Sequence, residues 1–418
     1  MGGFHGILAL MKRMRFLLPL FMFIRTVFNS AYRMIYAFLP IFGRGLGVDI
    51  KSMSLALTTR SVISSLGPFA ASVSDVRGRK FGMLLGLTMF TGGTALVVFF
   101  PTFPMFVVSL VLATTGKYVF DPGVQAYLGD RVDYRERGRV IAITEFGWSL
   151  AFILGIPVAG YLIALQGWMA PFRLFAWLGL VTILALYLTL PTDRHEERPN
   201  HGLVKNFRTV LTYGPALLAL GVALLISSAN EVINVVFGVW LDESLKTWVG
   251  PEGFAGVFKF LNFFKNSLGL DIALLILAAI VIGLSELIAE GLVARFVDRL
   301  GKPRAVALGL IVNSLAALLL PVLGKTTSGA LFGLSLFFIS FEFSLVSLIP
   351  MMTEIMPQTR ATLMAFNVSA LALGRGGGAL LAPYLYANGL MASGVAAVFL
   401  NGMALLLLRK FIREDKNG

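Results

Sequence analysis

The sequence predicts an all-α polytopic membrane protein, with twelve transmembrane helices arranged as two related six-helix bundles. Three observations lead to this fold class: the apolar composition, the sorting of basic residues between alternate loops, and an internal repeat of half the chain. Of the 418 residues, 57% are hydrophobic and 14% are charged, whereas a soluble protein keeps about a quarter of its residues charged. Twelve membrane helices of about 20 residues need roughly 240 apolar positions, which is close to the number present.

Twelve apolar runs, separated by turn signals, supply the elements. Leu, Phe, Ala, Val and Gly dominate them, as expected for helices that face lipid and approach one another closely. Arg25 interrupts the first run and no small-residue cleavage site follows, so we expect a helix rather than a cleaved signal peptide. The first bundle, residues 1–191, holds spans at 16–41, 52–74, 81–101, 104–127, 139–164 and 170–191. After a polar linker at 192–212, the second bundle, residues 213–418, holds spans at 213–241, 271–294, 304–324, 329–352, 360–386 and 391–409.

Membrane topology explains the net charge of +13. Most Lys and Arg residues lie before the odd-numbered spans or after the last one, and few lie in the intervening loops, such as Arg44 and Lys325. Because basic loops stay on the cytoplasmic side, we expect a multi-pass protein of the cytoplasmic (inner) membrane with both termini in the cytoplasm. The charge therefore gives no reason to expect nucleic-acid binding.

Enzymatic and cofactor chemistry has little support in the sequence. The chain has no Cys and three His, all outside the apolar runs, so we expect no disulfide, no thiolate site and no histidine-held metal. Gly324-Lys325-Thr326 lacks the upstream glycine of a phosphate-binding loop, because position 319 is Leu. The glycine-rich stretch 374–378 lies inside an apolar run and is expected to allow close helix packing. We therefore expect neither an ATPase nor another enzyme, and no cofactor.

The two halves of the chain share landmarks at an offset of about 223 residues. The segment Asp75-Val76-Arg77-Gly78-Arg79-Lys80 follows the second span, and Asp298-Arg299-Leu300-Gly301-Lys302 follows the eighth. Further pairs at nearly the same offset are Asp130 and Glu354, Gly155 and Gly378, and Tyr161 and Tyr384. These recurrences indicate that the second half repeats the architecture of the first.

These two loops resemble the loop signature of the major facilitator superfamily, Asp-Arg-x-Gly-Arg-Lys, which follows helices two and eight. The resemblance covers essentially the whole chain, although Val76 stands where the family usually has Arg. It implies the major facilitator fold and a secondary transporter that alternates between inward-open and outward-open states. It also implies gating loops formed by Asp75, Gly78, Arg79, Lys80, Asp298, Arg299, Gly301 and Lys302.

Polar side chains inside the apolar runs are candidates for substrate binding, because ionisable groups at membrane depth are costly. At about 100° per residue, Arg25, Asn29, Tyr32 and Tyr36 share one face of the first span, with Arg33 at its edge. Arg25 is the leading candidate, and pairing of Arg25 with an internal acid is the alternative. The rest of the candidate set comes from spans seven and eleven: Asn230, Asn234 and Arg375.

Acids inside the spans are candidate proton carriers, because a carboxyl group away from water can exchange a proton near neutral pH. The candidates are Asp121, Glu231, Glu342 and Glu286, and a structural role is the alternative for each. Acids and bases inside the spans are nearly equal in number. This balance predicts that several of them are paired with each other.

The arginines of the first span favour a small amphiphilic substrate with an anionic or zwitterionic part over a purely cationic drug. We expect a monomer that exports such a solute with proton coupling. Gly155-Ile156-Pro157-Val158-Ala159-Gly160 is similar to the Gly-Pro-rich antiporter motif of the drug-efflux branch, which favours export. Two alternatives stay open: a lysolipid-like flippase on the same fold, suggested by the Phe-rich outer segment 242–270, and a non-transporting membrane sensor.

Overall fold

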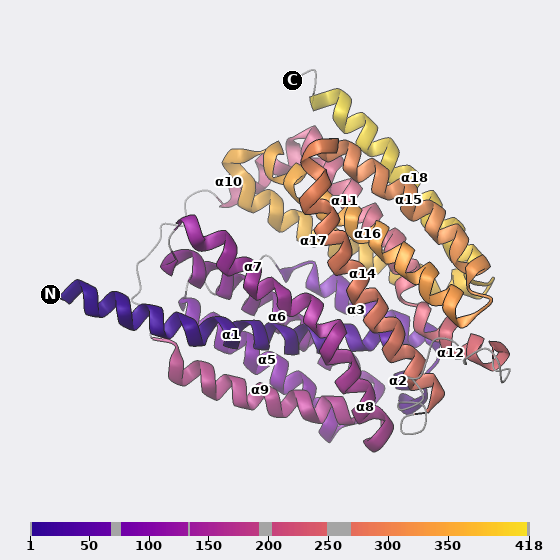
Figure 1. The fold of residues 1–418 in the computed structure, drawn as a ribbon, viewed down its shortest axis with the longest axis horizontal. Helices are drawn as coiled ribbons and strands as arrows, with labels where there is room; N and C mark the ends of the chain where they lie inside the picture. The colour runs from indigo at the N-terminus through magenta and orange to yellow at the C-terminus, as the bar shows by residue number, and fades with distance from the viewer. Residues whose placement is uncertain (1, 68–76, 133, 192–202, 249–268, 416–418) are drawn as a thin grey trace. The chain divides into compact units, whose positions relative to one another are not determined.

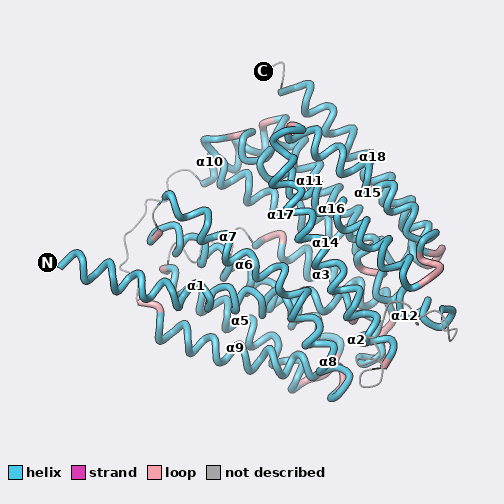
Figure 2. The backbone as a smooth tube through the Cα atoms, viewed as in Figure 1, coloured by secondary structure: helices cyan, strands magenta, loops and turns pink. Residues whose placement is uncertain are grey.

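A computed structural model describes residues 2–67, 77–132, 134–191, 203–248 and 269–415. Every regular element in these ranges is a helix, as the tube in Figure 2 shows, and this confirms the all-α fold class. The apolar runs form helices because, in lipid, a helix satisfies its backbone hydrogen-bonding groups within one segment. The helices follow one another along the chain through mostly short connections (Figure 1).

Nine helices within the described ranges are long and apolar enough to cross a membrane, and they match nine of the expected spans. The three other expected spans fall on α1 (Gly2–Ala37), α3 (Ile50–Ser64) and α17 (Arg360–Tyr386). The chain is thus a polytopic membrane protein, and the total of twelve spans stays a prediction. The end of the second span and its loop, residues 68–76, and most of the outer segment, residues 249–268, lie outside the described residues.

Three of the expected spans contain irregularities that the apolar pattern does not reveal. α1 ends at Ala37 and α2 (Leu39–Leu46) begins at once, with Pro40 in its first turn. The fifth span consists of α7 (Tyr134–Leu150), a π-helical turn η1 (Ala151–Gly155) and α8 (Ile156–Gln166). The seventh consists of α11 (Gly214–Asn234) and α12 (Phe237–Trp248). Proline at the first turn of a helix suits its N-terminus, so Pro40 accounts for the first of these breaks.

The chain forms two compact units, Met1–Met34 with Phe69–Arg198, and Ile35–Pro68 with Pro199–Gly418. The first unit contains most of α1, together with α5 (Arg79–Phe99), α6 (Phe103–Arg131), α7, η1, α8 and α9 (Ala170–Thr189). The second contains α2, α3, α10 (Leu203–Thr212), α11, α12, α14 (Leu270–Leu300), α15 (Lys302–Leu323), α16 (Thr327–Ile355), η2 (Pro357–Thr359), α17 and α18 (Leu390–Asp415). Because α3 packs along α17, residues 35–68 belong to the second unit. The division at residues 191 and 213 stays a prediction.

Small residues let the helices of the first unit touch at their backbones. A Cβ added to Gly86 on α5 would lie 2.5 Å from the carbonyl oxygen of Gly116 on α6, which is closer than real Cβ contacts allow. Next to this crossing, the ring of Phe28 lies 4.5 Å from that of Phe90 and 5.2 Å from that of Phe120, between centroids. In lipid, such close packing replaces the hydrophobic driving force of a soluble core.

Gly86→Ala is therefore expected to destabilise the protein by about 1–3 kcal/mol, because α5 and α6 must separate to admit one methyl group. The readout is the melting midpoint of the purified protein in detergent. Gly92→Ala is the matched control, since a Cβ at Gly92 on the same helix meets nothing within 4 Å. Equal midpoints for the two variants would contradict the close crossing.

In the second unit, α17 packs between α11 and α3 through its glycines. A Cβ on Gly374 would lie 2.2 Å from the carbonyl oxygen of Leu224 on α11. On the α3 side, the Thr58 hydroxyl donates to the carbonyl oxygen of Gly376 at 3.2 Å. The glycine-rich stretch 374–378 thus serves close helix packing, as predicted.

Buried amides join α15, α16 and α18 in the same unit. The amide nitrogen of Asn401 donates to the side-chain oxygen of Asn313 at 2.8 Å, and the amide nitrogen of Asn313 donates to the carbonyl oxygen of Phe337 at 2.9 Å. Hydrogen bonds of this kind hold helices together where lipid offers no competing partner.

Candidate functional site

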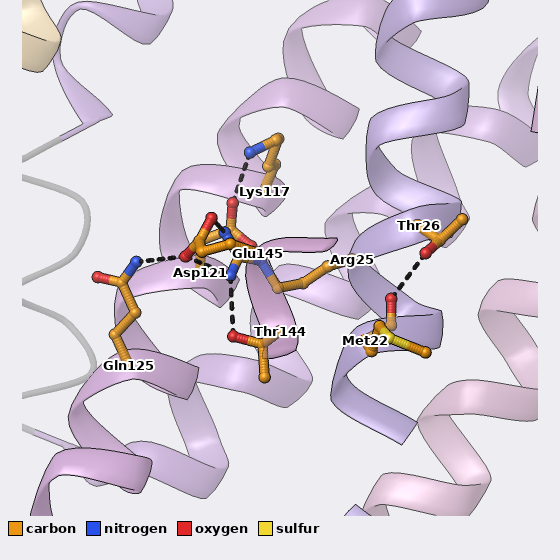
Figure 3. A network of polar contacts seen from close by, with 8 residues as sticks. All are labelled: Met22, Arg25, Thr26, Lys117, Asp121, Gln125, Thr144 and Glu145. Atoms are coloured by element: carbon orange, nitrogen blue, oxygen red, sulfur yellow. Dashed lines mark hydrogen bonds and ion pairs between the residues drawn. The ribbon is translucent and has the colours of Figure 1, made fainter. Parts of the chain in front are cut away.

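A group of charged side chains centred on Arg25 lies among α1, α6 and α7 in the first unit (Figure 3). Arg25 is 5% exposed. Its Nη1 and Nη2 donate to the two carboxylate oxygens of Glu145 at 2.6 and 2.8 Å. Its Nε lies 3.1 Å from Oδ1 of Asp121, and Nη1 also donates to the Thr144 hydroxyl at 3.1 Å. A bidentate pair of this kind fixes both the position and the orientation of a guanidinium.

Lys117 and Gln125 of α6 complete the Arg25 group. Nζ of Lys117 lies 2.5 Å from Oδ2 of Asp121, and Nε2 of Gln125 donates to Oε1 of Glu145 at 3.2 Å. Two bases and two acids therefore balance each other, which confirms the predicted pairing of charges inside the spans. The geometry favours the internal pairing considered for Arg25, and its substrate-binding role stays a prediction.

A close contact between α1 and α7 builds the Arg25 group. A Cβ added to Gly147 on α7 would lie 2.9 Å from the carbonyl oxygen of Met22 and 3.0 Å from Cβ of Arg25. Because a glycine occupies this position, the two backbones can touch. Thr144 and Glu145, less than one turn earlier on α7, then reach the guanidinium.

Arg33, two turns beyond Arg25 on α1, contacts two aromatic rings. Its Cζ lies 3.5 Å from the ring centroid of Trp148 on α7 and 4.0 Å from that of Phe152 in the π-helical turn η1. Arg33 is buried, and a cation over an aromatic face gains more from the ring when it is removed from water. These rings hold the second arginine of the predicted polar face.

A second polar group, entirely within the second unit, is centred on Glu231 of α11. Glu231 is 0% exposed, and its Oε1 accepts a hydrogen bond from the Tyr36 hydroxyl at 2.7 Å. The same hydroxyl accepts from Nη2 of Arg60 at 2.7 Å. Nδ2 of Asn234 donates to Oε2 of Glu231 at 3.3 Å, and Arg375 interacts electrostatically with the carboxylate. The buried carboxylate of Glu231 thus lies beside two arginines, with a hydrogen bond at each of its oxygens.

The helices around Glu231 approach it through glycines. A Cβ on Gly378 of α17 would lie 2.7 Å from Cβ of Glu231, and one on Gly238 of α12 would lie 2.9 Å from the carbonyl oxygen of Tyr36. Arg60 comes from α3, with Cζ 5.1 Å from the ring centroid of Tyr36. The last turn of α1 therefore joins α3, α11 and α17 in forming the Glu231 group.

Two predicted asparagines carry buried oxygens without a hydrogen-bond partner among the described residues. They are Oδ1 of Asn29 in the first unit and Oδ1 of Asn230 in the second. Such atoms are uncommon, because burying an unsatisfied polar group is costly. Each can accept a hydrogen bond from a polar solute, which is the role expected of these residues. Tyr32, on the same helix as Asn29, is partly exposed.

The four candidate proton carriers occupy different surroundings. Asp121 belongs to the Arg25 group, where Arg25 and Lys117 both pair with it. Glu231 is the centre of the second group. Glu286 on α14 and Glu342 on α16 are buried in the second unit. Which of the four carries a proton stays a prediction.

The two predicted gating loops share a backbone conformation where the next helix begins. Gly78 has φ 96° and ψ 152° before α5, and Gly301 has φ 81° and ψ 134° before α15. Positive φ favours glycine, which explains the residue at both positions. Arg79 is the first residue of α5, and Asp298 and Arg299 are exposed at the end of α14.

The loop lysines connect each loop to the end of another helix. Nζ of Lys80 donates to the carbonyl oxygen of Leu190 at 2.6 Å, at the end of α9. Lys302 pairs with Glu354 at the end of α16. Cations at helix C-termini stabilise the unpaired carbonyls and the helix dipole. Asp75 lies outside the described residues, and the gating role of both loops stays a prediction.

The candidate set from the sequence leaves out four participants in these groups: Arg60, Lys117, Glu145 and Trp148. The first three lie inside the expected spans 52–74, 104–127 and 139–164, where the near balance of acids and bases is the signal that each needs a partner. Trp148 had no comparable signal, because aromatic residues are frequent throughout the apolar runs.

The class of protein follows from three features of the described residues: apolar helices long enough to cross a membrane, paired charges buried among them, and two related loops. They define a polytopic helical membrane protein with polar groups inside its units. The family model of the Major Facilitator Superfamily matches residues 21–383. The chain belongs to this superfamily.

Comparison with known proteins agrees with this membership. The chain is similar to an uncharacterized MFS-type transporter, YwfA, of Bacillus subtilis, with 26% identity over 286 residues that cover 67% of this chain and 64% of the relative. It is also similar to the inner membrane transport protein YdhP of Escherichia coli K12, with 24% identity over 214 residues and 51% of each chain. The chain thus spans less than two thirds of the length of these two relatives.

A solved structure with the same fold is that of a POT family transporter in complex with a thioalcohol conjugated peptide. The TM-score is 0.73 at 14% identity, and the match covers 96% of both chains. This likeness extends over nearly the whole chain and concerns the fold alone.

Proposed function

We propose that the protein is a secondary active transporter that exports a small amphiphilic, zwitterionic solute in exchange for protons. It would work by alternating access of two six-helix halves, residues 1–191 and 213–418. Membership in the superfamily and the nine apolar helices support this proposal. In the same proposal, the protein is a monomer in the cytoplasmic membrane with both termini in the cytoplasm.

The observation that carries the proposal is the Glu231 group. The buried Glu231 carboxylate accepts hydrogen bonds at both oxygens and lies beside two arginines. Gain or loss of its proton therefore changes the net charge of the carboxylate and the two arginines together. When Glu231 is ionised, it competes with an anionic solute for the arginines. When it is protonated, the negative charge beside Arg60 and Arg375 is removed, which favours binding of the anionic group of that solute there. Binding of a proton and of an anion are therefore linked.

The sign of this linkage selects the substrate class. Exchange of protons for solute requires competition between the two, and a cationic group on the solute competes with the proton for Glu231. A zwitterion can place its cationic group at Glu231 and its anionic group at an arginine, so it is exported in exchange for a proton. A solute with an anionic group alone would bind together with the proton and move in the same direction.

Reconstituted vesicles test the proposal. A thermal-shift screen first selects a stabilising carbon skeleton from a panel that includes phenylalanine, 3-phenylpropanoate and phenethylamine, which differ in their charged groups. The labelled zwitterion should then accumulate in vesicles with an acidic lumen, up to about tenfold per pH unit for one-to-one exchange. Protein-free vesicles and a proton ionophore are the controls.

Each other outcome changes the proposal in a defined way. If the solute accumulates when the exterior of the vesicles is acidic, the solute moves together with the proton and not in exchange for it. If neither direction of the pH gradient changes solute uptake, transport is not coupled to protons. The lysolipid flippase is not proposed, because the segment that suggested it lies mostly in residues 249–268, outside the described residues. Binding of the selected solute without any flux would support the sensor instead.

A further inference from the structure

An apolar groove lies between α14, α15 and α16 of the second unit. These helices are three of the nine described helices that are long and apolar enough to cross a membrane. The Ser340 hydroxyl in the groove donates to the carbonyl oxygens of Leu336 and Phe337 in its own helix. The groove has a volume of about 320 Å³, and the side chains that line it include Leu292, Phe296, Leu300, Leu308, Val312 and Phe343.

The rows of residues that line the groove lead to the turn between α14 and α15. On α14, Leu292, Phe296 and Leu300 follow at steps of four residues, which places them on one face. This row covers about 12 Å of helix, beginning at the end of the expected span 271–294 and continuing to the turn that follows it. On α15, Arg304 lies one turn before Leu308, on the same face. One end of the groove is therefore bordered by a cation.

Three exposed arginines lie beside the groove: Arg299 and Arg304 at this end, and Arg295 next to Phe296 in the α14 row. Cζ of Arg295 lies 5.8 Å from the ring centroid of Phe296, which lines the groove. Among the described residues, Arg299 and Arg304 have no acidic partner. Lys302 is already paired with Glu354. Asp298 is the acid within segment 295–304, so the segment keeps a net positive charge.

We propose that this groove binds an anionic phospholipid of the surrounding membrane, with an acyl chain between α14, α15 and α16 and the phosphate on Arg299 and Arg304. An apolar cleft in continuity with unpaired guanidinium groups matches the two parts of such a molecule. Basic residues beside membrane helices attract anionic headgroups, and guanidinium groups bind phosphate through paired hydrogen bonds. The net negative charge of the headgroup distinguishes this ligand from zwitterionic phosphatidylcholine. The acyl chain distinguishes it from free phosphate.

Lipid binding to the purified full-length protein in detergent tests the site. Native mass spectrometry and melting midpoints would be recorded with phosphatidylglycerol, with phosphatidylcholine of the same chains, and with glycerol phosphate. We expect phosphatidylglycerol to bind at least about tenfold more tightly than phosphatidylcholine. The double variant Arg299→Gln/Arg304→Gln should weaken phosphatidylglycerol binding by about 20-fold and leave phosphatidylcholine binding nearly unchanged.

Two further variants separate the chain site from the headgroup site. Leu308 lines the groove and is 45% exposed. Leu308→Trp should weaken the binding of both lipids, because the larger side chain fills the cleft. The matched controls are Ile311→Trp and Arg409→Gln. Ile311 is 50% exposed and lies outside the groove lining, and Arg409 is on α18. Both variants should bind the lipids as the parent does. The proposal is overturned if the double variant binds phosphatidylglycerol as tightly as the parent. It is also overturned if glycerol phosphate competes as well as the intact lipid.

Discussion

Glu231→Gln is expected to abolish accumulation driven by a pH gradient, lowering the ratio of internal to external solute from about tenfold per pH unit to about one. Glutamine keeps the size of the side chain and can still accept from the Tyr36 hydroxyl, but it cannot take up and release a proton. Exchange of labelled for unlabelled solute without a gradient should persist, but at a higher solute concentration than in the parent, because the cationic group of the solute loses its carboxylate partner. The measurement is vesicle accumulation and counterflow, side by side.

The same variant removes the buried carboxylate beside Arg60 and Arg375, and loss of one partner of a buried pair costs about 3–5 kcal/mol. Glu231→Gln/Arg375→Gln restores the charge balance, so it separates a folding defect from a coupling defect. Glu286→Gln and Glu342→Gln are matched controls, because both acids are also buried in the second unit. If Glu231→Gln still accumulates solute and one of the controls does not, the proton is carried elsewhere.

Arg25→Gln is expected to lower the stability of the protein by about 3 kcal/mol, because Asp121 and Glu145 lose the guanidinium that both contact. The Glu145 side chain is 45% exposed, so solvent screens that part of the loss and the pairing with Asp121 contributes more. Melting midpoints in detergent, before any ligand is added, provide the measurement.

Arg25→Gln/Glu145→Gln should recover part of this loss, because Lys117 and Asp121 still balance each other. This charge-balanced variant also gives a fair test of substrate binding by Arg25. A ligand that stabilises the parent and the double variant equally would remove Arg25 from the binding site. Full stability of the single variant would mean that the buried pairs contribute little.

The fold class could be predicted because composition and spacing reflect the membrane directly. Apolar runs of the right length and sorted basic loops mark where helices cross lipid. Breaks inside a run could not be predicted, since Val235 and Val236 continue the apolar pattern although α11 ends at Asn234. Local hydrophobicity does not distinguish a helix that continues from one that ends and restarts.

The pairing of charges could be predicted, but the partners could not. A balance of acids and bases inside the spans indicates that they neutralise each other, whatever the packing. Arg25 and Glu145 are 120 positions apart, and they meet because Gly147 lets α7 touch α1. Likewise, Tyr36 could be placed on the polar face of the first span, but its bond to Glu231 depends on how α11 packs. Tertiary packing decides these contacts.

The π-helical turn η1 has a consequence for how this helix can diverge among relatives. A π turn accommodates one residue more than an α-helical turn, and each residue rotates the helix by about 100°. Loss of one residue between Ala151 and Gly155 would therefore leave an ordinary α-helical turn, because the π turn already absorbs the extra residue. This turn is therefore a place where a lineage can gain or lose one residue while the helix on either side of it keeps its pattern.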